Sequence, residues 1–179
     1  LLPNQASGPE DGLPLSEEIA SFKDKLRGKN KVLILEGAQV SSDWRMGMLR
    51  NDFARRLEEL EPEIAKVDRL WVLSACDTDQ RCWTSEGLGT SPFFHYLAEG
   101  LRGAAAGSDG RINLAELHEY VARNTKRWVR GARGSVQEPV LLPRSREGAN
   151  PSSVFLASSL PDEKETVVSA AVPDRDALK

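Results

Sequence analysis

The chain has 179 residues, 40% of them hydrophobic, which is enough for one hydrophobic core and predicts a single domain with some additional tail. Its 24 Lys and Arg residues against 27 Asp and Glu residues give a formal charge of −3 at pH 7, so we do not expect nucleic acid as a partner. Two cysteines are too few for a disulfide framework and no apolar run approaches the ~20 residues of a membrane span, so we expect a cytoplasmic protein that binds no membrane. The chain begins Leu1-Leu2-Pro3, without a Met or a signal-peptide pattern, and we expect it to be a fragment whose partners include other domains of a longer chain.

The first half of the chain predicts two helices around one strand. Ser16 as N-cap and Gly28 as C-cap predict a first helix. Residues 31–35 form a short continuous apolar run, which is typical of a strand covered on both faces in a parallel sheet. A crossover helix is predicted over residues 46–60, ended by Pro62. Its apolar face consists of Met46, Leu49, Phe53, Leu57 and Leu60.

The second half of the chain repeats this alternation of strands and helices. Residues 70–75 again predict a buried strand, and Ser91-Pro92 supplies a cap and a first-turn proline for a helix over residues 93–101. The next helix has one apolar face, which consists of Leu114, Leu117, Val121 and Trp128. Residues 139–143 predict a last core strand, and after it only residues 154–157 have a strand-like pattern. The alternation predicts an α/β fold with a mostly parallel sheet between two helical layers.

Three segments in a fixed order carry a family resemblance. They are LEGAQ at 35–39, SACDTDQ at 74–80 and FFHYLAEGL at 93–101, followed by Asp109-Gly110 and Glu116-Leu117. As an ordered set they resemble the caspase and metacaspase family of cysteine endopeptidases, in particular the C-terminal part of a bacterial caspase-like domain. The resemblance implies a three-layer caspase-like sandwich whose N-terminal strands are missing from this chain.

The same resemblance divides the chain into three parts. Residues 1–143 are expected to form the C-terminal part of a caspase-like domain, and residues 144–160 a final strand or a linker. Residues 161–179 are polar and weakly patterned, so we expect them to be a disordered tail.

The position of the family's nucleophile falls on Ala38. A cysteine peptidase needs a thiolate and a histidine that accepts its proton, whereas alanine has no nucleophilic atom. Gln39 stands at the His that follows the family's Cys, and the dyad His would lie upstream of Leu1. Glu36 stands where metacaspase-like members carry an Asp that helps to bind a basic residue before the scissile bond. The resemblance therefore implies a catalytically inactive scaffold or regulatory module that keeps an acidic pocket.

Cys76 offers an alternative nucleophile. The sequence Ser74-Ala75-Cys76-Asp77 also resembles the Gln-Ala-Cys-Arg motif of animal caspases, and with an upstream His it would give an active caspase-like or metacaspase-like cysteine endopeptidase. The other interpretation is that Cys76 is a small apolar residue at a strand end. The two histidines lie in predicted helices, where we expect His95 at a helix edge and His118 in solvent.

Acidic side chains follow the second predicted strand. Asp77, Asp79 and Glu86 come after its carboxyl end, the edge at which open α/β sheets bind ligands. With Glu36 they predict an acidic cleft for a peptide or protein segment. The alternative is that Asp77 and Asp79 only make hydrogen bonds within a turn.

The sequence predicts neither a metal site nor a cofactor site. Asp109-Gly110 with Glu116 resembles the second half of an EF-hand loop, but Ala105 and Gly107 occupy the first two carboxylate positions. A turn that caps the next helix is the better interpretation. Trp44 and Trp83 follow strand ends, where they line a cleft or, as we favour, pack against neighbouring residues. A small-molecule-binding α/β domain unrelated to peptidases stays open as a third hypothesis.

Overall fold

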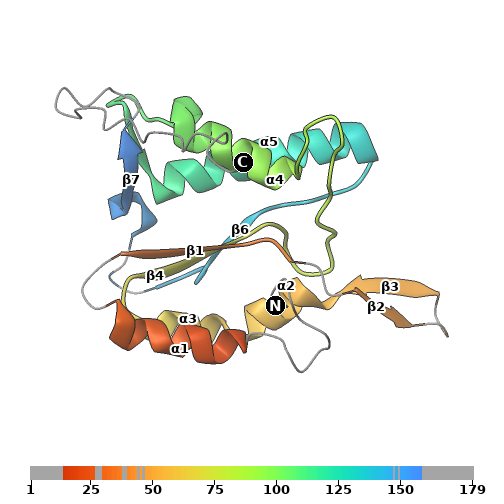
Figure 1. Ribbon diagram of the computed structural model, residues 1–179, viewed down its shortest axis with the longest axis horizontal. Coiled ribbons are helices and arrows are strands. Elements are labelled where there is room, and N and C mark those ends of the chain that lie inside the picture. The colour runs from red at the N-terminus through yellow and green to blue at the C-terminus, as the bar shows by residue number, and fades with distance from the viewer. Residues whose placement is uncertain are drawn as a thin grey trace, which may run out of the picture.

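The computed structural model describes residues 14–26, 30–37, 40–43, 45, 47–146, 148 and 150–158. They form a mixed α/β fold in which helices cover both faces of a small central sheet (Figure 1). The α/β class predicted from the sequence is confirmed. Ala38, Gln39, Trp44 and the predicted tail at 161–179 lie outside the described residues. In the described part of the chain, no helix is long and apolar enough to cross a membrane.

The central sheet has three strands in the order β1 (Lys31–Leu35), β4 (Leu70–Ser74) and β6 (Val140–Leu142). Strands β1 and β4 are parallel, as predicted, and all five residues of β4 are buried. Strand β6 runs antiparallel to β4, so the expectation of a mostly parallel sheet is wrong for one of the two pairings. The reason is that the connection from β4 to β6 contains two α-helices, α4 (Pro92–Glu99) and α5 (Leu114–Arg133), with a short helix and a short strand between them, rather than a single crossover helix. The two α-helices return the chain to the edge where β4 ends, and β6 must then run back (Figure 1).

One face of the sheet is covered by α1 (Leu15–Lys25), α2 (Asp52–Glu59) and α3 (Glu61–Lys66) (Figure 1). Alternate residues of β4 serve the two faces, because side chains of a strand point to opposite sides. Val72 belongs to the core beneath this helical layer, whereas Leu73 belongs to the core on the other face. The buried residues of the first core are Ile19, Leu35, Leu57, Ile64, Val67, Leu70, Val72 and Leu142.

The predicted helix over residues 46–60 is wrong in its first part. Strand β3 (Met48–Asn51) pairs antiparallel with β2 (Val40–Asp43), and α2 begins only at Asp52. The Asn51 side chain caps α2 by accepting a hydrogen bond from the Phe53 backbone N–H at 3.2 Å. Pro62 does not end the helix but lies in the first turn of α3, where a missing N–H costs nothing.

The first helix also starts differently from its prediction. It begins at Leu15 after Pro14, so Ser16 lies inside the helix and does not cap it. Gly28, its predicted end, lies outside the described residues.

The opposite face of the sheet is covered by α4 (Pro92–Glu99), the short helix η2 (Gly100–Ala104) and α5 (Leu114–Arg133) (Figure 1). Ser91 caps α4 as predicted, and Asn113 with Glu116 forms a capping box at the start of α5. The predicted turn before α5 is thus confirmed. Gly100 lies so close to α5 that an added Cβ would stand 2.6 Å from Leu117 Cδ1, so a larger residue there would force the buried Leu117 side chain to shift. The buried residues of this core are Leu73, Ala75, Phe93, Leu97, Ala105, Ile112, Leu117 and Val121.

A second small sheet lies at the end of the molecule away from the β2–β3 hairpin (Figure 1). Strand β5 (Arg111–Asn113) pairs antiparallel with β7 (Phe155–Ser158), which follows the short helix η3 (Pro151–Ser153). The strand predicted near residues 154–157 is confirmed, but it does not join the central sheet.

Candidate functional site: an acidic pocket at the carboxyl edge of the sheet

An open pocket of about 480 Å³ lies where β1 ends and the segment after β4 returns toward α4. Its volume is within the range of small-ligand sites, about 300–1,000 Å³. Four hydroxyl-bearing residues and two carboxylate residues are among its lining residues. The lining residues are Glu36, Thr84, Ser85, Glu86, Gly89, Thr90 and Ser91.

Glu36 has one paired and one unpaired oxygen. Its Oε2 accepts a hydrogen bond from Ser91 Oγ at 2.8 Å. Its Oε1 is buried and has no hydrogen-bond partner among the described residues. Burial raises the pKa of Glu36, and the hydrogen bond from Ser91 opposes that rise. Glu36, which lines the pocket, is therefore a half-buried carboxyl group with one unused acceptor oxygen, and that oxygen is shielded from solvent in this conformation.

Ser91 fixes the orientation of this carboxyl group. Its hydroxyl accepts a hydrogen bond from the Phe94 backbone N–H at 3.1 Å while it donates to Glu36. Ser91 is 4% exposed, so water does not compete with these two bonds. The start of α4 and the end of β1 are joined through one side chain.

Gln137 holds the segment that forms the pocket rim. This fully buried side chain donates from Nε2 to the Ala75 carbonyl at 2.9 Å, and its Oε1 accepts from the Trp83 backbone N–H at 3.0 Å. Further along, Ser85 and Thr90 form an isolated bridge, with 3.1 Å between Ser85 N and Thr90 O. Gln137 thus connects the rim to the end of β4, and the Ser85–Thr90 bridge joins the two sides of the rim.

The two thiols lie beside each other: Cys76 follows the end of β4, and Cys82 lies in the segment after it. Cys82 also contacts the segment after β1, because its Sγ donates to the Gly37 carbonyl at 3.6 Å. A hydrogen bond with Cys76 and burial raise the pKa of Cys82 well above its ordinary value. Cys76 is 1% exposed, and its sulfur accepts from Asn51 Nδ2 at 3.6 Å. Cys82 is therefore in surroundings that do not favour a thiolate, and Cys76 is buried away from solvent.

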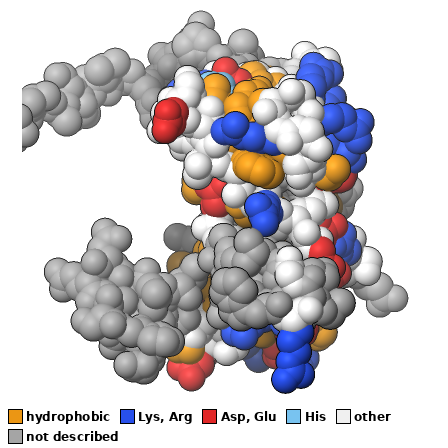
Figure 2. All heavy atoms as spheres, turned by 90° about the vertical axis from the view of Figure 1, so that its right-hand side faces the viewer, with side chains coloured by type: hydrophobic (Ala, Val, Ile, Leu, Met, Phe, Trp, Pro, Cys, Tyr) orange, Lys and Arg blue, Asp and Glu red, His pale blue; other side chains and the backbone are white. Residues whose placement is uncertain are grey.

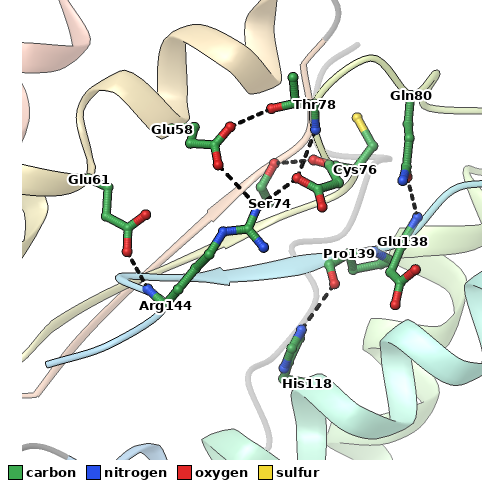
Figure 3. A network of polar contacts seen from close by, with 11 residues as sticks. Glu58, Glu61, Ser74, Cys76, Thr78, Gln80, His118, Glu138, Pro139 and Arg144 are labelled. Atoms are coloured by element: carbon green, nitrogen blue, oxygen red, sulfur yellow. Dashed lines mark hydrogen bonds and ion pairs between the residues drawn. The ribbon is translucent and has the colours of Figure 1, made fainter.

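Neither histidine is bonded to a thiol. His95 Nε2 lies 3.5 Å from Glu99 Oε1 on α4, and His118 Nε2 lies 3.0 Å from the Pro139 carbonyl oxygen. The expectation that His118 is solvated is wrong, because it is half-buried and links α5 to the segment before β6 (Figure 3). His95 is partly exposed on the side of its helix, as expected.

Asp77 is not among the residues that line the pocket, and Arg144 neutralises its charge. Its Oδ1 lies 2.7 Å from Arg144 Nη2 and also accepts from the Thr78 backbone N–H at 2.8 Å. The same guanidinium lies 3.4 Å from Glu58 Oε1, and Glu61 accepts a hydrogen bond from the Arg144 backbone N–H (Figure 3). Asp77 therefore belongs to a separate network, the Arg144 cluster of Glu58, Glu61, Asp77 and Arg144.

Of the acidic residues expected to share one cleft, the structure brings together only Glu36 and Glu86. Asp79 is exposed in a turn with φ 61°, a conformation that Asp tolerates better than most residues, and it is absent from the pocket lining. Trp83 is absent from that lining too, and its ring packs against Arg133. Among the described residues, no group of three or more His, Cys, Asp and Glu side chains could hold a metal ion.

Comparison with known proteins gives no match. No protein-family model, no curated protein and no solved structure matches this chain. The family resemblance of the sequence therefore stays a prediction, and function has to be argued from the pocket itself.

The sequence does not predict the roles of Ser91 and Gln137, two residues that organise the pocket. Ser91 was identified only as a helix cap, and its second bond to Glu36 depends on how α4 packs against β1. Nothing in the sequence around Gln137 marks it, since both of its partners lie on distant segments.

Proposed function

We propose that this chain is a non-catalytic caspase-like module that binds a peptide segment by receiving its Lys or Arg side chain in the Glu36 pocket. The observation that carries the proposal is the buried Oε1 of Glu36, which lacks a partner among the described residues. A carboxylate removed from water without full hydrogen bonding is unfavourable, and a cationic N–H group is the partner that relieves this cost best.

The rest of the lining favours the same ligand. Glu86 adds a second negative charge, and Thr84, Ser85 and Thr90 contribute hydroxyl-bearing side chains. No Lys or Arg of the described residues lines the pocket. An ammonium or guanidinium group on a long apolar stem suits such a site, because its charge reaches Glu36 while the stem contacts the walls.

Two features support binding rather than cleavage. Ala38 occupies the position that the family resemblance assigns to the nucleophile. Cys76, the alternative nucleophile, is 1% exposed and bonded to Asn51, and neither described histidine contacts it. Cysteine peptidases need an accessible thiolate beside a base, so the active-peptidase alternative has no supporting contact here.

Binding is tested with the full chain and fluorescent peptides that carry one Arg, Lys or norleucine in a Gly/Ser background. We expect the Arg and Lys peptides to bind and the norleucine peptide not to bind. Glu36→Gln should weaken binding of the Arg peptide about tenfold or more, which corresponds to the loss of about 1.4 kcal/mol. Glu17→Gln, which removes an exposed charge on α1, is the matched control. Equal binding of Arg and norleucine peptides would overturn the proposal.

Cleavage is tested with the same Arg and Lys peptides, beside Cys76→Ala and Ala38→Cys variants. We expect no turnover by the parent chain, and a gain in Ala38→Cys would support a scaffold that lacks its nucleophile. Turnover by the parent that Cys76→Ala abolishes would establish the active-peptidase alternative instead.

A further inference from the structure

A basic surface lies on the last turns of α5, formed by the exposed residues Arg127, Arg130 and Arg133, and Arg133 contacts the rim of the acidic pocket. Thr84 links the two, because it lines the pocket and its carbonyl accepts a hydrogen bond from Arg133 Nη2 at 3.2 Å. Figure 2 looks at the end of the molecule where α5 ends, and Lys and Arg side chains lie there beside hydrophobic ones. A site for a cation and a surface for an anion are therefore neighbours.

Arg133 is held at the pocket rim by two aromatic rings. Its Cζ lies 5.6 Å from the ring centroid of Trp83 and 5.6 Å from that of Trp128. Cation–π contacts of this kind fix the guanidinium without neutralising its charge. Arg133 is exposed, and Thr84 takes one of its five N–H groups. Its fork is suited to bind a carboxylate.

The basic residues of α5 differ in how they are neutralised. Arg123 pairs with Glu119 at 3.4 Å, and Lys126 pairs with Glu138 at 2.6 Å. Arg127 and Arg130 are exposed and make no ion pair with a carboxylate of the described residues. The helix dipole favours cations at a helix C-terminus, but it explains neither the two rings around Arg133 nor the contact with the pocket rim.

We propose that the ligand of the Glu36 pocket is a bipolar peptide, in which an acidic residue close to the basic anchor binds Arg130 and Arg133. This inference rests on the proposed function. Since Thr84 belongs to both surfaces, we expect the acidic residue within about three positions of the anchor, a span of about 10 Å in an extended chain. A peptide carboxylate fits better than a nucleic-acid strand, because Glu36 and Glu86 would repel a run of phosphates and the whole chain carries a charge of −3.

The experiment compares peptides that carry one Arg and, at each of three positions on either side, either Asp or Asn. Binding to the full chain is measured by fluorescence anisotropy. We expect Asp to bind about fivefold more tightly than Asn at one or more positions, in line with a charge-assisted contact. This ratio should fall toward one in 0.5 M NaCl, because the contact is exposed to solvent.

Variants assign the effect to the basic surface. Arg130→Gln and Arg133→Gln should each bring the Asp-to-Asn ratio close to one, and Arg130→Gln leaves the contacts of Arg133 with the Trp83 and Trp128 rings in place. Arg123→Gln, on the same helix but paired with Glu119, is the control and should keep the ratio. An Asp-to-Asn ratio near one at all positions in the parent chain would overturn the inference.

Two outcomes distinguish a failure of the bipolar-peptide inference from a failure of the proposed function of the Glu36 pocket. If Glu36→Gln weakens the Arg peptides while Asp and Asn bind alike, the proposed function stands and the bipolar ligand is wrong. If Glu36→Gln has no effect, the proposed function itself is wrong. Binding of a mixed-sequence single-stranded DNA that Arg130→Gln weakens would assign the basic surface to nucleic acid and would also overturn the inference.

Discussion

The Glu36 pocket and the Arg144 cluster are two acidic sites at the same edge of one sheet, and they differ in where the compensating cation comes from. In the Arg144 cluster the chain supplies it, since Arg144 lies 2.7 Å from Asp77 and 3.4 Å from Glu58. In the pocket, Glu36 receives only the hydroxyl of Ser91, and one of its oxygens stays without a partner among the described residues. A carboxylate after a strand is thus a candidate ligand site only if the fold leaves it uncompensated.

Gln137 holds the pocket rim in place through its two buried hydrogen bonds. Of the substitutions proposed here, we expect Gln137→Leu to have the largest effect on stability. The substitution leaves the buried Ala75 carbonyl and Trp83 N–H without partners, so we expect a loss of about 3 kcal/mol in the free energy of unfolding. Urea denaturation measures it. Gln80→Leu, which removes a partly buried acceptor of the Glu138 N–H, is the control and should cost about 1 kcal/mol. Equal losses in the two variants would show that Gln137 has no special role.

The half-buried carboxyl group of Glu36 should make the stability of the protein depend on pH. Because burial raises its pKa, the folded state favours protonated Glu36, so its contribution to stability falls as pH rises from the unfolded-state pKa, about 4.3, to the folded-state pKa. Glu36→Gln should therefore be more stable than the parent at pH 7, by about 1 kcal/mol given that the side chain is only half-buried. The difference should shrink when denaturation is repeated at pH 4. A variant less stable than the parent at pH 7 would contradict this account of Glu36.

The Arg144 cluster should show the smallest effect. A double-mutant cycle of Asp77→Asn and Arg144→Gln should give a coupling of about 0.5 kcal/mol, because both side chains are partly exposed, and it should weaken in 0.5 M NaCl. Asp77→Asn should also leave binding of the Arg peptide unchanged. If it weakens that binding as much as Glu36→Gln does, the two acidic sites are not distinct.

The sequence predicted the central strands better than the segment between them. Residues 31–35 and 70–74 are continuous apolar runs, and such runs suit strands covered on both sides. Met46, Leu49 and Phe53 share helical spacing by coincidence, and that spacing concealed the β2–β3 hairpin. The overlooked signal was Gly47, whose φ of 63° in the turn is a conformation that glycine adopts without strain.

The site was predictable only in part, for a physical reason. The positions of Glu36 and Asp77 after neighbouring strands could be read from the sequence. Which of the two is neutralised could not, because Arg144 reaches Asp77 from the far end of β6 and Ser91 reaches Glu36 from the start of α4. Charge compensation is a tertiary property, and sequence spacing does not encode it.

The hydroxyl of Ser91 donates to Glu36 and accepts from the Phe94 N–H, so the bond to Glu36 helps to hold the side chain in the orientation that caps α4. The first turn of α4 can therefore report on the pocket. A ligand that draws Glu36 away from Ser91 would loosen this cap, and hydrogen exchange at the Phe94 amide would then speed up. A ligand that binds only Oε1 would leave the exchange rate as it was. The amide of Phe94 thus distinguishes, without any label on the ligand, which oxygen of Glu36 is engaged.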